Sequence, residues 1–316
     1  MSAPAAAAVG LLPFFQSTAA GSSFDAVSFA AALALITGLM LVLSYSTTQA
    51  MTGGSAGGGV AAPQTDASTG AADDASAVDA QHERPVERDG TTGAELDRAV
   101  GPPENYPPWQ DDDDETDPLA TMTTGMLLAN VAITQGVFLV AVVGAAVLTG
   151  VPAAAMGLSP AALGPVPLLF GIGLGVALYV ANELGAAVAE GAGIEYDERL
   201  RAVLAPDNAR GWAVLLGFVL PLVAVFEEVL FRAAIVGVLA AGFGVSPWLL
   251  VAGSSLLFAA GHGLQGPAGV AVTGALGFVL AAAFVLTGSL LTVVVAHYLV
   301  NALEFGVHEG LGVEWV

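Results

Sequence analysis

Ionisable side chains are rare in the second half of the chain, and those present are spaced so that they could do chemistry. Residues 225–232 read VFEEVLFR and place the carboxylates Glu227 and Glu228 and the guanidinium of Arg232 inside a long apolar run. Residues 233–303 contain no Asp, Glu, Lys or Arg at all. Because charged groups are expensive to keep within a membrane span, these three residues are candidates for a functional site.

The spacing within VFEEVLFR predicts two different roles for its two carboxylates. Glu228 and Arg232 are four residues apart and share a helix face, so we expect them to form an ion pair. Glu227 lies about 100° round the helix from Glu228 and has no partner on its own helix. A carboxylate placed in this way is suited to act as a general base.

Three further polar residues lie on later apolar segments. His262 ends one segment just before a Gly-rich turn, and His297 and Asn301 share a face of another because they are four residues apart. Glu227 could meet all three in one polar pocket. A base, a second base or metal ligand and a neutral amide are the groups needed to activate a water and stabilise an oxyanion. The helical zinc-protease motif H-E-x-x-H is absent, which excludes that class of site.

The elements that position these residues must be membrane helices. The 316 residues are 55% hydrophobic with a mean hydropathy of +0.76, a composition that predicts an all-α polytopic bundle in the cell membrane. Cysteine is absent, so disulfides and thiolate metal sites are excluded. Apolar runs of about 20 residues cross the hydrocarbon. We predict about seven spans, at roughly 26–43, 120–149, 166–188, 212–241, 246–262, 268–286 and 289–306.

The chain divides into three parts by composition. We predict an N-terminal segment with one span at 1–45, an acidic disordered linker at 46–118 and the functional core at 119–316. The 28 acidic residues, the seven Arg and the lack of Lys resemble proteins of halophilic archaea. A formal net charge of −21 with no basic patch argues against a nucleic-acid partner. The loop at 190–210 holds three Arg and is therefore predicted to be cytoplasmic.

Three motifs together resemble the CAAX protease and bacteriocin-processing family, to which the Ras-converting enzyme belongs. They are Glu227-Glu228-x-x-x-Arg232, Phe258-x-x-x-His262 and His297-x-x-x-Asn301, in that order and each on a predicted span. The resemblance covers about residues 120–306. It implies a membrane-embedded endopeptidase of all-helical fold that acts on a membrane-associated peptide or protein, lipid-modified for some relatives.

The resemblance also implies a role for each motif residue. Glu227 and His262 would activate a water, His297 and Asn301 would stabilise the oxyanion, and Glu228 with Arg232 would hold the geometry of the site. Glu227, His262 and His297 could also supply three ligands to a divalent metal such as zinc, with one position open for water. The metal-dependent and the metal-free, glutamate-dependent mechanisms both remain open at this stage.

Three other classes of function fit part of the pattern. Histidines on two spans could ligate a haem or a metal, but such a site does not need the buried carboxylate pair. A transporter could use Glu227 as a proton relay, but it would be expected to show internal repeats, and none is evident. An immunity or scaffold protein on the same fold would tolerate loss of Glu227.

Overall fold

The computed structural model describes residues 24–53, 123–191 and 199–313, and within these ranges every regular element is a helix. The predicted all-α fold is therefore confirmed. The predicted linker lies almost entirely outside the described residues. Its first part does not, because the helix α2 (Ala26–Gly53) continues through residues 46–53. Ser46 and Thr47 donate to the carbonyls one turn earlier in this helix, so polar residues extend it.

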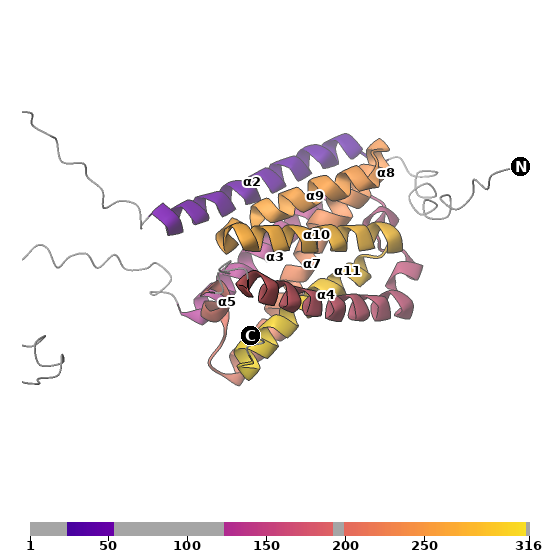
Figure 1. Cartoon of the computed structure of the whole chain (residues 1–316). Coiled ribbons are helices and arrows are strands. Elements are labelled where there is room, and N and C mark those ends of the chain that lie inside the picture. The colour runs from indigo at the N-terminus through magenta and orange to yellow at the C-terminus, as the bar shows by residue number, and fades with distance from the viewer. Residues whose placement is uncertain (1–23, 54–122, 192–198, 314–316) are drawn as a thin grey trace, which may run out of the picture. The chain divides into compact units, whose positions relative to one another are not determined.

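The remaining elements follow in chain order. After α2 come α3 (Thr124–Leu148), the short turns η2 (Ala153–Met156) and η3 (Pro160–Leu163), α4 (Pro165–Gly191), α5 (Arg199–Leu204), α6 (Ala209–Val214), η4 (Leu215–Val219), α7 (Leu220–Glu228), η5 (Val229–Val238), α8 (Leu239–Phe243), α9 (Pro247–Gly261), η6 (Gly263–Gln265), α10 (Gly266–Thr287), α11 (Leu290–Glu304) and η7 (Phe305–Gly310). Figure 1 shows α2 lying along α9, with α10 on the other side of α9.

Among the described residues, six helices are long and apolar enough to cross a membrane, so this is a multi-pass membrane protein. They are Ala26–Thr47, Thr124–Leu148, Pro165–Val188, Ala209–Phe243, Gly266–Thr287 and Leu290–Gly310. The seventh predicted span, 246–262, is the 15-residue helix α9. At about 1.5 Å per residue, α9 is shorter than the hydrocarbon core of roughly 30 Å. It begins at Pro247 and ends before His262.

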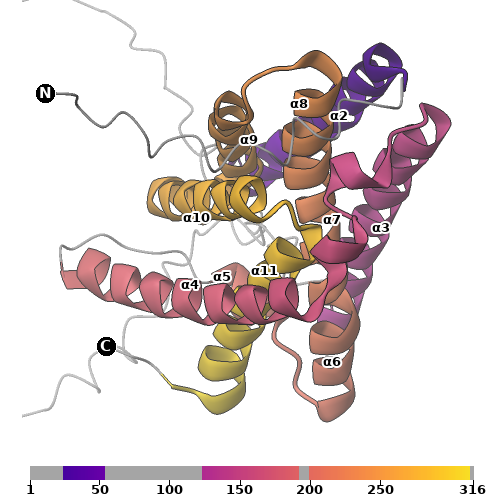
Figure 2. The ribbon, with the colours of Figure 1, turned by 90° about the vertical axis from the view of Figure 1, so that its right-hand side faces the viewer.

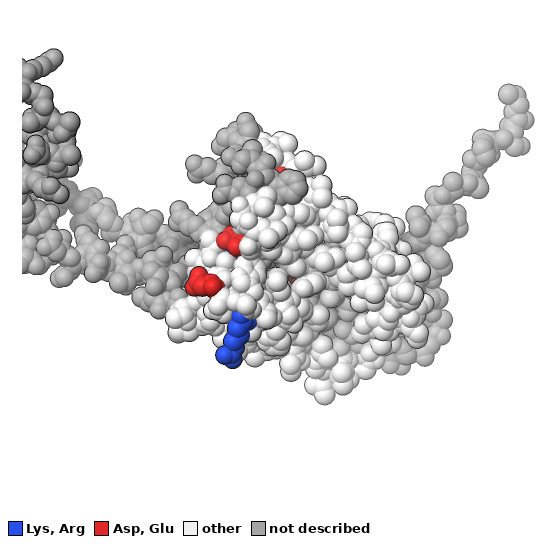
Figure 3. All heavy atoms as spheres, turned by 90° about the horizontal axis from the view of Figure 1, so that it is seen from below, with Lys and Arg blue, Asp and Glu red and all other residues white. Residues whose placement is uncertain are grey.

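The outer surface of the bundle fits a hydrocarbon environment. Large apolar side chains from four different helices are mostly exposed: Leu35, Val140, Leu169 and Leu256. Figure 3 shows a face that is almost free of charge, with the few charged side chains gathered toward one end. The exposed apolar residues therefore form the lipid-facing surface that the hydropathy predicted.

A central rod carries the first motif. The elements α6, η4, α7, η5 and α8 form one continuous helix, Ala209–Phe243, which is the most buried of the six candidate spans. Its neighbours are α3, α9, α10 and α11, so side chains near residue 228 are surrounded on several sides. Burial on all sides is what places charged groups of the rod in contact with other helices and away from lipid.

The helix α11 is held close to α4 by small residues. A side chain at Gly171 would lie 2.6 Å from the carbonyl of Thr292, and one at Gly175 would lie 2.8 Å from the carbonyl of Ala296. Figure 2 shows α11 crossing α4 at this contact. The G-x-x-x-G spacing in α4 therefore lets the backbones approach closely, as such motifs do in membranes. Because Ala296 precedes His297, this contact fixes the position of His297 along the helix axis of α4.

The N-terminal helix packs against the rest of the bundle. Phe29 and Leu33 of α2 are buried in the main apolar cluster, and the backbone amide of Asp25 donates to the carbonyl of Thr149. Ser44 donates to the carbonyl of Gly261 at 2.9 Å, next to His262. At the exposed start of this helix, hydrogen bonds from Ser28 keep the pKa of the Asp25 carboxyl below its usual value.

Candidate active site

The first motif lies where the central rod changes its helical geometry. Glu227 and Glu228 are the last residues of α7, and Arg232 lies in η5, a stretch of π-helix that begins at Val229. Two other π-helical stretches, η4 and η7, also flank the site. Such wide turns are rare and occur mostly near functional sites, because they redirect side chains. The periodicity of an apolar sequence gives no sign of them, and the sequence did not predict them.

Glu228 and Arg232 form the ion pair predicted from their spacing. The Nη1 of Arg232 donates to the Oε1 of Glu228 at 2.8 Å, and Nη2 donates to the carbonyl of Gly277 at 3.0 Å. The guanidinium also lies 4.6 Å from the centre of the Phe258 ring. The two side chains are 0% and 1% exposed, so neither charge has access to solvent. The pair therefore neutralises two charges that could not be buried singly.

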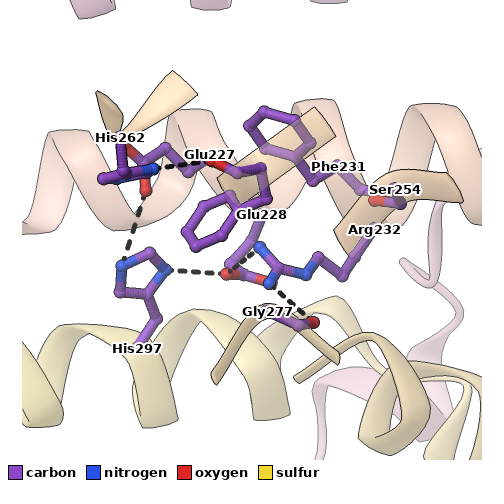
Figure 4. A network of polar contacts seen from close by, with 9 residues as sticks. Glu227, Glu228, Phe231, Arg232, Ser254, His262, Gly277 and His297 are labelled. Atoms are coloured by element: carbon purple, nitrogen blue, oxygen red, sulfur yellow. Dashed lines mark hydrogen bonds and ion pairs between the residues drawn. The ribbon is translucent and has the colours of Figure 1, made fainter. Parts of the chain in front are cut away.

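His297 connects the two carboxylates, as Figure 4 shows. Its Nδ1 lies 2.7 Å from the Oε1 of Glu228, and its Nε2 lies 3.5 Å from the Oε2 of Glu227. A carboxylate only accepts, so Nδ1 carries the hydrogen of this bond. Glu228 thereby fixes the orientation of the imidazole and turns Nε2 toward Glu227. Sequence spacing gave no indication of this contact, because the two residues are 69 positions apart.

Phe258 and His262 of the second motif are linked through backbone and ring. The Nδ1 of His262 donates to the carbonyl of Phe258 at 2.8 Å, and the two rings lie 4.6 Å apart. The ring of Phe258 lies between this histidine and the guanidinium of Arg232. Phe258 thus packs against both residues, and its carbonyl also fixes the tautomer of His262.

One cavity of about 310 Å³ collects the predicted reacting groups. Glu227, His262, His297 and Asn301 all line it, whereas Glu228 and Arg232 do not. Its walls are mainly apolar, with Leu128, Val131, Leu220, Val272 and Leu276 among them. The first motif thus presents one carboxylate to the cavity and keeps the other behind it. Enclosed, mostly apolar cavities with a few converging polar groups are the usual form of a small-molecule or peptide site.

Polar side chains from several helices also line the cavity, and cross-helix pairs lie beside it. Asn182 of α4 donates to Glu304 at 2.5 Å, and both residues line the cavity together with Arg201. Arg201 pairs with Glu309 at 3.1 Å, and His308 contacts Glu183 at 2.8 Å. Both His308 and Glu309 follow the last predicted span, 289–306, and each pairs with a residue of another helix. These pairs tie η7 to α4 and α5.

Glu227, His262 and His297 are the residues predicted as possible metal ligands. In the part of the chain that the structure describes, no group of three or more His, Asp and Glu side chains is placed to hold a metal ion. Glu227, His262 and His297 line one cavity, and because the Nδ1 atom of each histidine donates to a protein acceptor, Nε2 is the ring nitrogen through which each could hold a metal.

Comparison with known proteins identifies the segment that carries the site. Residues 209–303 match the family model described as "Type II CAAX prenyl endopeptidase Rce1-like". No curated protein and no solved structure matches the chain. The match begins at the start of the central rod and includes all three motifs, but it is shorter than the predicted 120–306, so α2, α3 and α4 lie outside it. The resemblance to this family that the three motifs indicated is thus confirmed over residues 209–303.

Proposed function

We propose that the chain is an intramembrane endopeptidase that hydrolyses a peptide bond of a membrane-associated substrate with a water activated by Glu227. One observation carries this proposal: two adjacent buried carboxylates are in opposite situations. Glu228 is occupied by Arg232 and His297, whereas Glu227 faces the cavity and approaches only the Nε2 side of His297. The family match of the same segment supports peptide hydrolysis as the reaction.

In the proposed reaction, a water in the cavity gives a proton to Glu227, assisted by His262. The resulting hydroxide attacks the carbon of the scissile carbonyl, and the carbonyl oxygen becomes an oxyanion. The side-chain amide of Asn301 and the Nε2–H of His297 in its imidazolium form would donate to that oxyanion. Collapse of this intermediate breaks the C–N bond. The proton held by Glu227 then passes to the leaving amine, so the water is fully consumed.

The surroundings of His297 suit this role. As an imidazolium, it would bring the buried group of Glu227, Glu228, Arg232 and His297 to two negative and two positive charges. Charge balance of this kind lowers the penalty of burial. A histidine fixed through Nδ1 and free to donate through Nε2 is also pre-oriented, so no reorganisation is needed as the oxyanion forms.

The proposed substrate is a peptide that reaches the site from the membrane, prenylated at a CAAX cysteine as the family description suggests. The mainly apolar lining of the cavity supports a substrate that is extracted from lipid. The non-catalytic and haem-binding alternatives make no use of the difference between Glu227 and Glu228, and the transport alternative lacks the internal repeats that it predicts.

The test is cleavage of a prenylated CAAX peptide by the purified full-length chain in lipid vesicles at high KCl, with products identified by mass spectrometry. We expect one new C-terminus from the wild-type protein. Since each residue would act in the transition state, His262→Ala and Asn301→Ala should lower kcat by roughly 10²–10³-fold. Absence of cleavage by a folded wild-type protein would contradict the proposal for this substrate.

The same assay, repeated in the presence of a zinc chelator, tests whether cleavage requires a metal. Cleavage that survives a strong zinc chelator supports the glutamate-dependent mechanism. Cleavage that is lost and then restored by zinc would assign Glu227, His262 and His297 as ligands instead. Comparing peptide termini in membranes of cells that carry the wild-type or Glu227→Gln chain would then name the natural substrates.

A further inference from the structure

One wall of the cavity is formed by a single face of α3, outside the segment that matches the family. Leu128, Val131 and Gln135 of this helix all line the cavity. They follow one another at intervals of three and four residues, which places them on one side of the helix. Gln135 is the polar member of this row. The same side of α3 packs against the central rod: Phe138, one turn after Gln135, contacts Phe226 of the rod at a ring distance of 6.1 Å.

The amide of Gln135 is incompletely satisfied. Its Oε1 atom is buried and accepts no hydrogen bond from any described residue. Buried acceptors in folded proteins nearly always have a partner, because an unpaired one loses its hydrogen bonds to water and gains none from the protein. Gln265 and Asn182 also line the cavity, and each of these two amides has a protein partner, Thr273 and Glu304 respectively. Gln135 therefore stands apart as a cavity group that awaits a donor from outside the chain.

We propose that Gln135 binds the main chain of the substrate, with its Oε1 accepting a peptide N–H close to the bond that is cleaved. This inference rests on the proposed function. A peptide in extended form presents N–H donors that must find acceptors once they leave water, and an apolar cavity offers few. Gln135 and Glu227 line the same cavity and come from the neighbouring helices α3 and α7, so a main chain held by the amide would pass near the carboxylate. Gln135 is thus a substrate-positioning residue contributed by α3.

The experiment measures binding of a fluorescent prenylated CAAX peptide to the full-length Glu227→Gln protein in vesicles, where turnover does not interfere. A set of peptides replaces one peptide N–H at a time with an ester oxygen. We expect one ester to weaken binding by about 3- to 10-fold, the size of one hydrogen bond. Adding Gln135→Leu should weaken binding of the all-amide peptide to a similar degree and remove the sensitivity to that ester.

Two controls separate recognition from folding. Thr134→Leu makes the same kind of change on the exposed side of α3 and should leave binding unchanged. Gln135→Leu should unfold at the same temperature as its parent or higher, because it removes an unpaired buried acceptor; a structural role, such as holding an internal water, predicts a lower one.

The outcomes distinguish this inference from the proposed function. If the wild-type chain cleaves the peptide while Gln135→Leu leaves Kd, kcat/KM and the ester pattern unchanged, the role of Gln135 is refuted and the protease assignment stands. If the folded wild-type chain neither binds nor cleaves the peptide, the proposed function fails for this substrate, and the inference fails with it.

Discussion

Glu227 and Glu228 are identical side chains one position apart, yet their surroundings differ completely. Glu228 is fully buried and accepts from Arg232 and His297, whereas Glu227 borders the cavity. The difference arises because successive residues of a helix point about 100° apart, toward different neighbours. In this account Glu228 is a positioning residue for His297 as well as the counter-charge of Arg232, and these two roles can be separated by mutation.

Replacing only Glu228 should lower both stability and activity, and replacing its partner Arg232 as well should recover the stability but not the activity. Glu228→Leu alone leaves Arg232 buried without a counter-charge and should destabilise the protein by about 3–5 kcal/mol. Combining it with Arg232→Met removes both charges, so most of the lost stability should return. Cleavage should stay low in the double variant, because His297 has lost the acceptor for its Nδ1 hydrogen. Thermal unfolding and peptide cleavage measured on the same samples check both parts, and wild-type cleavage by the double variant would refute the positioning role.

The pair between Glu228 and Arg232 was predictable because it is local, set by four-residue spacing on one helix. The contact between Glu228 and His297 was not, because it depends on how α11 crosses the rod. Gln135 was also missed. A single amide in an apolar helix resembles ordinary interhelical hydrogen bonding, and only the burial of Oε1 without a partner distinguishes it.

At the level of elements, the close contact of α4 with α11 sets the position of His297. Gly175→Ala would bring a methyl group within 2.8 Å of the Ala296 carbonyl, so α11 must shift. We expect a loss of about 1–3 kcal/mol in unfolding free energy and slower cleavage. Gly173→Ala is the matched control, because nothing lies within 4 Å of its added carbon. Equal effects of the two substitutions would show that helix propensity, and not this contact, determines the result.

The contact of α2 with α9 should support the orientation of His262. Ser44→Ala removes the hydrogen bond to the Gly261 carbonyl and should slow cleavage several-fold, since a typical hydrogen bond contributes about 0.5–1.5 kcal/mol. Ser46→Ala is the control, because Ser46 donates to Val42 within its own helix. Steady-state kinetics of the two variants provide the measurement. Identical kinetics would show that this hydrogen bond does not support the orientation of His262.

Hydropathy predicted the long helices. A long apolar run lies in lipid, where its backbone polar groups can only bond to one another, and an α-helix satisfies them all. Hydropathy did not separate α9 from the true long spans, because a short apolar helix covered by α2 and α10 has the same composition as a spanning one. The π-helical stretches around Glu228 were likewise invisible, because they arise from packing of the rod.

For the whole molecule, all candidate catalytic residues lie in a unit formed by residues 1–52 and 118–316, and residues 53–117 form a second unit by themselves. The second unit holds 16 of the 28 acidic residues. The cytoplasmic placement of the 190–210 loop and the halophilic origin remain predictions. Phe29 and Leu33 are buried in the main apolar cluster, so α2 is part of the folded bundle and not a detached anchor.

Replacing residues 54–117 with an uncharged Gly/Ser segment of equal length should leave thermal unfolding and cleavage of a short peptide unchanged. The reason is that the site and its supporting contacts lie within the other unit. The loss of negative charge should lower the solubility of the protein. It should also make the solubility less dependent on salt concentration, since ions screen the repulsion between like charges. If the variant unfolds at the wild-type temperature but no longer cleaves the peptide, the acidic segment takes part in catalysis or substrate capture.

The central claim is that Glu227 activates the attacking water, and the most direct test is the kcat of purified Glu227→Gln on a prenylated CAAX peptide. Glutamine preserves the shape and the contact with His297 but cannot take a proton. We predict a fall in kcat of roughly 10²–10⁴-fold, the usual contribution of a general base, with an unchanged unfolding temperature. Cleavage at the wild-type rate by a folded Glu227→Gln protein would contradict the account.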